Sequence, residues 1–149
     1  MGYGNDAEGF AKALEEFEKK ATNRIRLFRR ALILKVSSRV VLRTPVDTGR
    51  ARANWQATLS APASGIVDSE DKTGESALAA VRSESEKTRS DDDRSFFLTN
   101  NLPYIEALEN GHSQQAPAGM VAITIAEFEG LAEQVRNQVE GGSNADTGS

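Results

Sequence analysis

Apolar side chains recur every three or four residues from Phe10 to Val40, a spacing that predicts one amphipathic helix over Phe10–Leu42. The members of this stripe are Phe10, Leu14, Phe17, Ala21, Ile25, Phe28, Leu32, Val36 and Val40. At 1.5 Å per residue, a helix of about 35 residues is about 50 Å long, which exceeds the diameter of a small domain. We therefore expect the helix either to bend or to project beyond the rest of the protein.

Basic side chains are concentrated in the second half of this helix and just after it. Between Arg24 and Arg52 there are nine basic residues and one acid, Asp47, a local charge of +8. Since the whole chain carries −4, the remainder carries −4 − 8 = −12. Such segregation suits head-to-tail packing between copies, a basic face for nucleic acid, or a solvated helix surface. The candidate interface residues on this segment are Arg24, Arg26, Arg29 and Arg30.

A Pro-Val-Asp-Thr-Gly-Arg element follows the helix and predicts a sharp reversal of the chain. Pro45 ends the helix, Asp47 is a turn former, and Gly49 tolerates a backbone that other residues avoid. Alternating apolar and polar residues over Ala51–Ser60 then favour a strand, with a further helical turn as the alternative. Trp55, the only tryptophan, is expected in the core or at a subunit boundary.

A second element rich in Pro and Gly lies between residues 100 and 120. Pro103 predicts a short helical turn over Pro103–Glu109 that presents Tyr104, and Gly111 predicts its end. The segment His112–Gly119, which includes Gln115 and Pro117, has no periodicity and is expected to be an ordered loop. We predict that this loop lies close to the turn formed by Pro45–Gly49.

The middle and the end of the chain complete an α+β prediction. A variable polar excursion over residues 61–95 is expected to be partly mobile and to carry one modest helix over Glu75–Lys87. Phe96–Thr99 is predicted to be a strand that pairs, mostly antiparallel, with Ala51–Ser60. A second amphipathic helix over Met120–Glu140 is predicted to stop at the glycine pair of residues 141 and 142.

These elements predict a single domain over residues 1–142. The long and the carboxy-terminal helices are expected to pack on the small sheet, as in α+β folds. Glycine-rich residues 1–5 are expected to form a mobile arm, and residues 143–149 a disordered tail.

The composition argues against an enzyme, a cofactor or a metal site. With no cysteine and one histidine, His112, the side chains needed for a metal centre or a nucleophilic triad are missing. The tripeptide Asp-Thr-Gly occurs at residues 47–49 and 146–148 and is also found in aspartic proteases. Pro45 interrupts the first copy and the second lies in the predicted tail, so we predict no catalytic residues. The apolar runs are too short to span a membrane, which predicts a soluble protein made in the cytoplasm.

The two Pro- and Gly-rich elements together resemble a known family. The segments "RTPVDTGRARANW" at residues 43–55 and "NLPYIEALENGHSQQAPAGMV" at residues 101–121 are similar to the neck or tail-completion proteins of tailed bacteriophages. These are also described as minor tail or gene-product-ten-like components. In that family the first element follows a long amino-terminal helix and the second precedes a carboxy-terminal helix. The matching positions here are Pro45, Asp47, Gly49, Pro103, Tyr104, Glu109, Gly111, Gln115, Pro117 and Gly119.

The resemblance implies a structural protein of the virion, located in the neck or tail after synthesis in the host cytoplasm. It implies a ring of identical subunits, six by the symmetry of phage tails, around the channel through which genomic DNA passes. The implied neighbours are connector or stopper, tail-terminator and tail-tube proteins. The alternative from the residues alone is a small nucleic-acid-binding module that uses the basic helix face to contact the phosphate backbone non-specifically.

Overall fold

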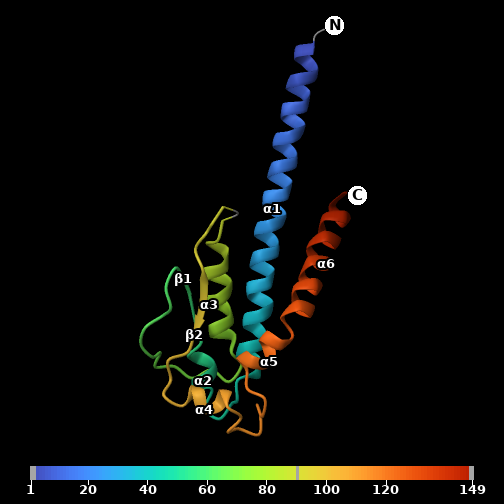
Figure 1. The fold of residues 1–149 in the computed structure, drawn as a ribbon. Coiled ribbons are helices and arrows are strands. Elements are labelled where there is room, and N and C mark those ends of the chain that lie inside the picture. Colours follow the sequence, from blue (N-terminus) through green and yellow to red (C-terminus); the bar gives the residue numbers. More distant parts are fainter. Residues whose placement is uncertain (1–2, 90, 148–149) are drawn as a thin grey trace.

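In the computed structural model, which describes residues 3–89 and 91–147, the chain is organised around one long helix. Helix α1 (Tyr3–Arg43) is 41 residues long, and its amino-terminal half extends beyond the body of the protein (Figure 1). One end therefore projects, which is one of the two arrangements expected from the sequence. The expected mobile arm over residues 1–5 is wrong from Tyr3 onward, because the helix already includes that residue. The first two residues lie outside the described part of the chain.

Shorter elements form the body around the carboxy-terminal half of α1. They are α2 (Arg50–Ala53), β1 (Gln56–Leu59), α3 (Glu75–Glu86), β2 (Phe96–Thr99), α4 (Ile105–Glu109), α5 (Val121–Ala126) and α6 (Phe128–Thr147). Helices α3 and α6 flank α1 on two sides, and the sheet lies against α3 (Figure 1). The α+β class predicted from the sequence is thus confirmed.

The sheet consists of β1 and β2, which pair antiparallel with Gln56 opposite Thr99 and Leu59 opposite Phe96. The predicted strand Phe96–Thr99 is confirmed. The predicted strand Ala51–Ser60 is wrong in its first part, because Arg50–Ala53 forms the helical turn α2. Alanine and arginine are good helix formers, and the alternation that suggested a strand arises from small alanines buried by a turn.

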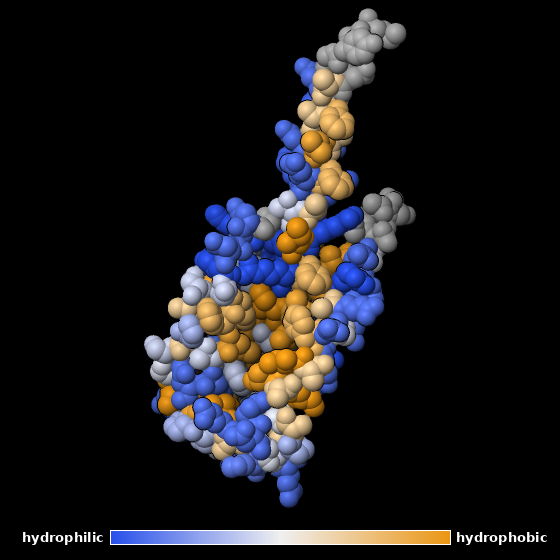
Figure 2. All heavy atoms as spheres, viewed as in Figure 1, coloured by the Kyte–Doolittle hydropathy of each residue, from blue (hydrophilic) through white to orange (hydrophobic). Residues whose placement is uncertain are grey.

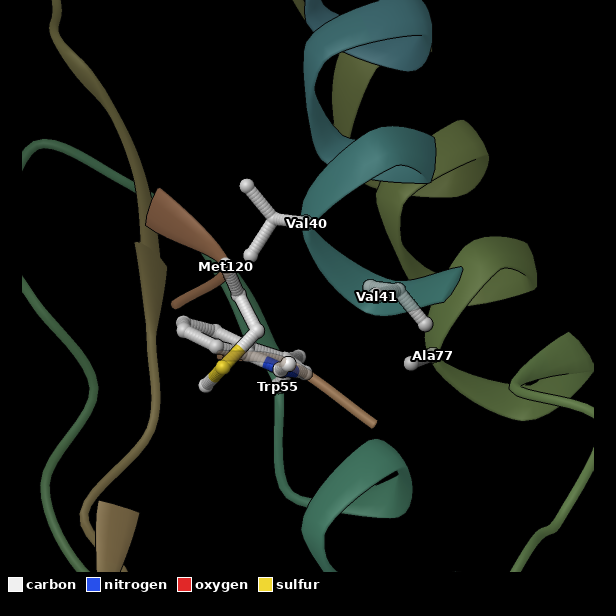
Figure 3. Close-up of a cluster of buried hydrophobic side chains, with 6 residues drawn as sticks. Val40, Val41, Trp55, Ala77 and Met120 are labelled. Carbon is white, nitrogen blue, oxygen red and sulfur yellow. The ribbon is translucent and has the colours of Figure 1, made fainter. Parts of the chain in front are cut away.

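The core lies where α1 ends, between the sheet, α3 and the loop that precedes α5. Its buried side chains are Val40, Val41, Trp55, Ala77, Ala116 and Met120 (Figure 3). Trp55 is only 6% exposed, and its indole Nε1 donates a hydrogen bond of 2.8 Å to the hydroxyl of Thr44. The hydroxyl of Thr44 in turn donates to the carbonyl of Val40 at 2.7 Å. The tryptophan is therefore a core residue with its polar atom satisfied, not a residue of the exposed surface.

The excursion between the strands is part of this body. Helix α3 confirms the helix predicted over Glu75–Lys87, and it buries Ala77, Val81 and Ser85. Gly74 precedes it with φ +77°, and a Cβ atom there would approach a methyl group of Val41 to 2.8 Å. The absence of a side chain at Gly74 therefore allows the start of α3 to pack directly against α1.

The carboxy-terminal helix is broken, contrary to the single helix predicted over Met120–Glu140. Helix α5 ends at Ala126 and α6 begins at Phe128, with Glu127 between them. The guanidinium of Arg43 donates to both carboxylate oxygens of Glu127 at 2.8 Å and to the Thr124 hydroxyl at 3.0 Å. These contacts hold the junction between α5 and α6 against the end of α1. The break in the helix therefore coincides with a tertiary interaction, which the local sequence does not predict.

The predicted stop at residues 141 and 142 is also wrong, since the backbone of α6 is helical as far as Thr147. Gly141 does not take the positive φ that would close a helix. Glycine lowers helix stability by roughly 1 kcal/mol but does not forbid the conformation. Of the predicted disordered tail, residues 148 and 149 lie outside the described residues. No helix in the described ranges is long and apolar enough to cross a membrane.

Candidate functional site

The two sequence elements that carry the family resemblance meet in space. The side-chain amide of Gln115 donates from Nε2 to the carbonyl of Val46 at 3.0 Å, and the Val46 amide donates to Oε1 of Gln115 at 2.9 Å. A side chain thus pairs with the backbone of the other segment as a neighbouring strand would. The prediction that the loop His112–Gly119 lies close to the turn Pro45–Gly49 is confirmed.

Glu109 closes the loop on which Gln115 lies. Its carboxylate accepts three hydrogen bonds from the first amides of α5, at 2.9 Å from Met120 and Val121 and 2.8 Å from Ala122. Partial burial disfavours the charged form, but these three amide donors outweigh it and hold the pKa of Glu109 below its usual range. The carboxylate therefore acts as a cap that ties the end of α4 to the start of α5.

Two glycines permit this closed loop. Gly111 has φ +86° and donates to the carbonyl of Leu108, while the next amide, of His112, reaches back to Ala107. This pair of bonds is a Schellman motif, which ends α4. A Cβ atom at Gly111 would lie 2.4 Å from the carbonyl oxygen of Pro117, and one at Gly119 would lie 2.4 Å from that of Glu109. Both positions therefore require glycine for space as well as for φ.

The turn at Pro45–Gly49 is equally confined. Gly49 has φ +89°, and a Cβ atom there would lie 2.5 Å from the backbone of Asp71 and Lys72. The carbonyl of Gly49 accepts the amide of Asp71 at 3.1 Å. Hydrogen bonds from Thr73 and Ser76 hold the pKa of the Asp71 carboxyl below its usual range. The Pro-Val-Asp-Thr-Gly element is thus the junction between α1, α2 and the segment that leads into α3.

The remaining motif residues lie around this junction. Pro45 is buried, Asp47 is exposed, and Pro103 and Tyr104 are exposed at the start of α4. Pro45, Asp47, Tyr104 and Gln115 are among the residues that line a cleft of about 230 Å³ between the two elements. Within the described ranges, no group of three or more His, Cys, Asp or Glu residues could hold a metal ion.

The four candidate interface arginines have different environments. Arg29 donates from Nη1 to the carbonyl of Asp92 at 3.0 Å and also contacts the carbonyl of Arg94. Arg30 donates from Nη2 to the carbonyls of Glu86 at 2.5 Å and Thr88 at 2.9 Å. These two side chains therefore hold the end of α3 and the loop leading to β2.

Arg26 and Arg24 differ from that pair. The guanidinium of Arg26 forms no hydrogen bond within the described residues, and its buried Nε, like that of Arg30, has no partner there, whereas Arg24 is exposed. The structure thus leaves only part of the predicted basic face open to a neighbour. Trp55, the other candidate interface residue, lies in the core.

Sequence reasoning missed the exposure of the apolar stripe on the projecting half of α1. Phe10, Phe17 and Ile25 are 70%, 69% and 60% exposed, and Leu14 is 47% exposed. Figure 2 shows apolar side chains along the projecting part of α1, on the same face of the molecule as an apolar hollow in the body. The hollow has a volume of about 330 Å³ and is lined by Leu32, Ile33, Val36, Ser37, Val40, Trp55, Phe96, Leu98, Val121 and Phe128. The spacing revealed the stripe, but whether another surface covers it depends on the tertiary fold.

In comparisons with known proteins, no family model, curated protein or solved structure matches the chain.

Proposed function

We propose that the protein is a structural component of the neck or tail of a tailed bacteriophage. The observation that carries the proposal is the pairing of Gln115 with Val46. The two segments that resemble tail-completion proteins are 69 residues apart in sequence at this pair and form one closed unit. If the two segments form one structural unit, both need the residues that resemble the family. These include Glu109 and the confined glycines Gly49, Gly111 and Gly119.

The proposed assembly is a ring, with six copies as the expected number, around the channel for genomic DNA. A ring closes through contacts between two different surfaces of each subunit. The segregated charge offers such a pair: the basic segment of α1, which includes Arg24 and Arg26, and acidic surface on an adjacent copy. Connector or stopper, tail-terminator and tail-tube proteins would then be the neighbours along the tail axis.

The assembly contact can be tested by reversing the charge of arginines in α1 without releasing the loop between α3 and β2. Arg29 and Arg30 bind backbone carbonyls of the loop that leads to β2, so the double variant Arg24→Glu, Arg26→Glu leaves these bonds in place. We expect this variant to fold but to fail to restore infectious particles to a phage that lacks the gene. A matched control, Arg82→Glu with Arg89→Glu, makes the same charge change at exposed residues outside the basic segment. Equal particle yields from both variants would contradict the proposed contact.

A small nucleic-acid-binding module remains the alternative outcome of a second test. Light scattering after size-exclusion chromatography should detect a discrete ring when the protein is mixed with its neck partners. A protein that instead binds duplex DNA, with an affinity that falls steeply as salt rises, would favour the alternative. The guanidinium groups of Arg29 and Arg30 already bind carbonyls of their own chain, which reduces the basic surface available for phosphates.

A further inference from the structure

The projecting half of α1 carries an apolar surface that lacks a covering element in the described part of the chain. Phe10 and Phe17 are more than two-thirds exposed, although large aromatic side chains gain most from burial. The same stripe continues along α1 through Phe28, Leu32 and Val36, and the last two line the hollow in the body. The bare stripe and the hollow are therefore two parts of one continuous apolar surface on one face (Figure 2).

We propose that two copies of the free protein pair through this surface, with their α1 helices antiparallel. A surface that is complementary to itself meets a second copy across a two-fold axis, with each contact made twice. When two copies face each other in this way, the stripe of each lies over the hollow of the other. The occupant of the hollow is thus the projecting helix of a second copy.

The spacing of the stripe fits an antiparallel pair in a definite register. If the two-fold axis passes near residue 23, the residue numbers of facing partners add to about 46. The facing pairs are then Phe10 with Val36, Leu14 with Leu32, Phe17 with Phe28, and Ala21 with Ile25. Each stripe residue from Phe10 to Ile25 thus faces a stripe residue of the other copy. The paired region spans residues 10–36, about 40 Å of helix.

A row of charges beside the stripe supports this orientation. Glu15, Glu18, Arg26 and Arg29 follow the stripe residues Leu14, Phe17, Ile25 and Phe28 by one position each and so lie along one flank of the helix. In the antiparallel register, Glu18 of one copy lies beside Arg26 of the other. Within the described residues, Glu15 and Glu18 form no ion pair, and Nε of Arg26 has no hydrogen-bond partner. Flanking charges of this kind determine orientation in paired helices.

The charges also argue against two competing arrangements. A parallel pair would place the arginine-rich segment of each copy beside the same segment of the other. An antiparallel pair centred on Ile25 would preserve the apolar contacts but bring Arg26 close to its own counterpart. The register near residue 23 combines apolar contacts with opposite charges, which neither of these two arrangements does.

This pairing does not rest on the proposed role in a phage. Subunits of a closed ring are related by rotation about the ring axis, whereas this contact has two-fold symmetry. It therefore concerns the protein before assembly. Because it uses Arg26, which the proposed ring contact also uses, pairing and entry into a ring would compete.

The first test is the mass of the free protein in solution. Light scattering should give twice the 16.1 kDa of one chain, with dissociation on dilution. Phe17→Glu should raise the dimer dissociation constant about tenfold or more, which corresponds to about 1.4 kcal/mol. The control is Leu27→Glu, which places the same charge at an apolar residue, 49% exposed, away from the stripe. A wild-type monomer at all concentrations, or equal effects of the two substitutions, would overturn the proposal.

The second test fixes the orientation and uses the absence of cysteine from the chain. Two single variants, Leu14→Cys and Leu32→Cys, are oxidised separately and as an equal mixture. A disulfide requires Cα atoms about 4.4–6.8 Å apart. The antiparallel register predicts a cross-linked dimer in the mixture and none with either variant alone. Cross-linking of either variant by itself would indicate a parallel pair, and no cross-link in the mixture would exclude the stated register.

Discussion

Gln115 and Val46 are joined by two hydrogen bonds, of 2.9 and 3.0 Å, between a side-chain amide and a backbone amide group. This pair is the direct link between the loop before α5 and the turn after α1. Aspartate is too short to reproduce it, and glutamate cannot donate to the Val46 carbonyl. The geometry thus accounts for a glutamine at this position.

Gln115→Ala should lower the free energy of unfolding by about 1 kcal/mol, because exposed hydrogen bonds each contribute at the low end of the usual range. The control is Gln114→Ala at the neighbouring exposed residue. Urea unfolding followed by far-UV circular dichroism measures both. If the two variants are equally stable, the pairing contributes nothing to stability.

Gly111→Ala and Gly119→Ala should each destabilise the fold by more than about 1 kcal/mol. Each substitution demands a positive φ from an L-residue and also places a Cβ atom 2.4 Å from a carbonyl oxygen. Gly130→Ala is the opposite case, because that glycine is helical and has no neighbour within 4 Å of the added atom. It should raise the melting temperature slightly. Similar melting temperatures for the three variants would refute this account of the loop.

Glu109 should make stability depend on pH. Its pKa is lowered in the folded state, so its contribution is fully present above the ordinary glutamate pKa of about 4.3 and is lost as pH falls through the lower folded value. Glu109→Gln should cost about 1 kcal/mol at neutral pH, as does the loss of a helix cap.

That difference from wild type should narrow as the solution is made acidic. Unfolding curves measured across a pH series provide the test. Glu106→Gln, at an exposed residue of the same short helix, should remain close to wild type throughout. A gap between Glu109→Gln and wild type that is unchanged at acid pH would mean that the charge of Glu109 is not what holds α5.

The parts of the fold that follow local rules were predictable from the sequence. The three-and-four spacing located α1, and the confined glycines at 49, 111 and 119 located the two turns. The break at Glu127 was not predictable, because its partner Arg43 lies 84 residues away. The turn α2 was predicted only as the alternative to a strand, because alanine and arginine alternate there and the burial of Ala51 and Ala53 depends on the surrounding core.

The basic and apolar surfaces of α1 were only partly predictable, because contacts between residues distant in sequence decide which side chains are covered. Charge segregation could be counted, but the sequence does not say which arginines bind their own chain. Arg29 and Arg30 reach carbonyls 56 to 65 residues away. The exposure of Phe10 likewise depends on the body ending before it reaches the start of α1.

The loop between α3 and β2 should depend on the two arginines that bind it. Its own structure is built on Asp92, whose carboxylate accepts the Arg94 guanidinium at 2.6 and 2.8 Å, and these bonds hold the pKa of Asp92 below its usual range. Arg29 and Arg30 then attach this loop to α1 through backbone carbonyls.

Arg29→Ala and Arg30→Ala should each speed amide hydrogen exchange in residues 86–94, because the loop loses its attachment to α1 while the core remains. Global stability should fall by only about 1 kcal/mol, since these hydrogen bonds lie at partly exposed sites where water can replace the lost donor. Arg39→Ala removes the same charge from an exposed position of α1 and should leave the loop unchanged. If exchange in the loop is the same in all three variants, the arginines do not secure it and their charge remains available to a neighbouring molecule.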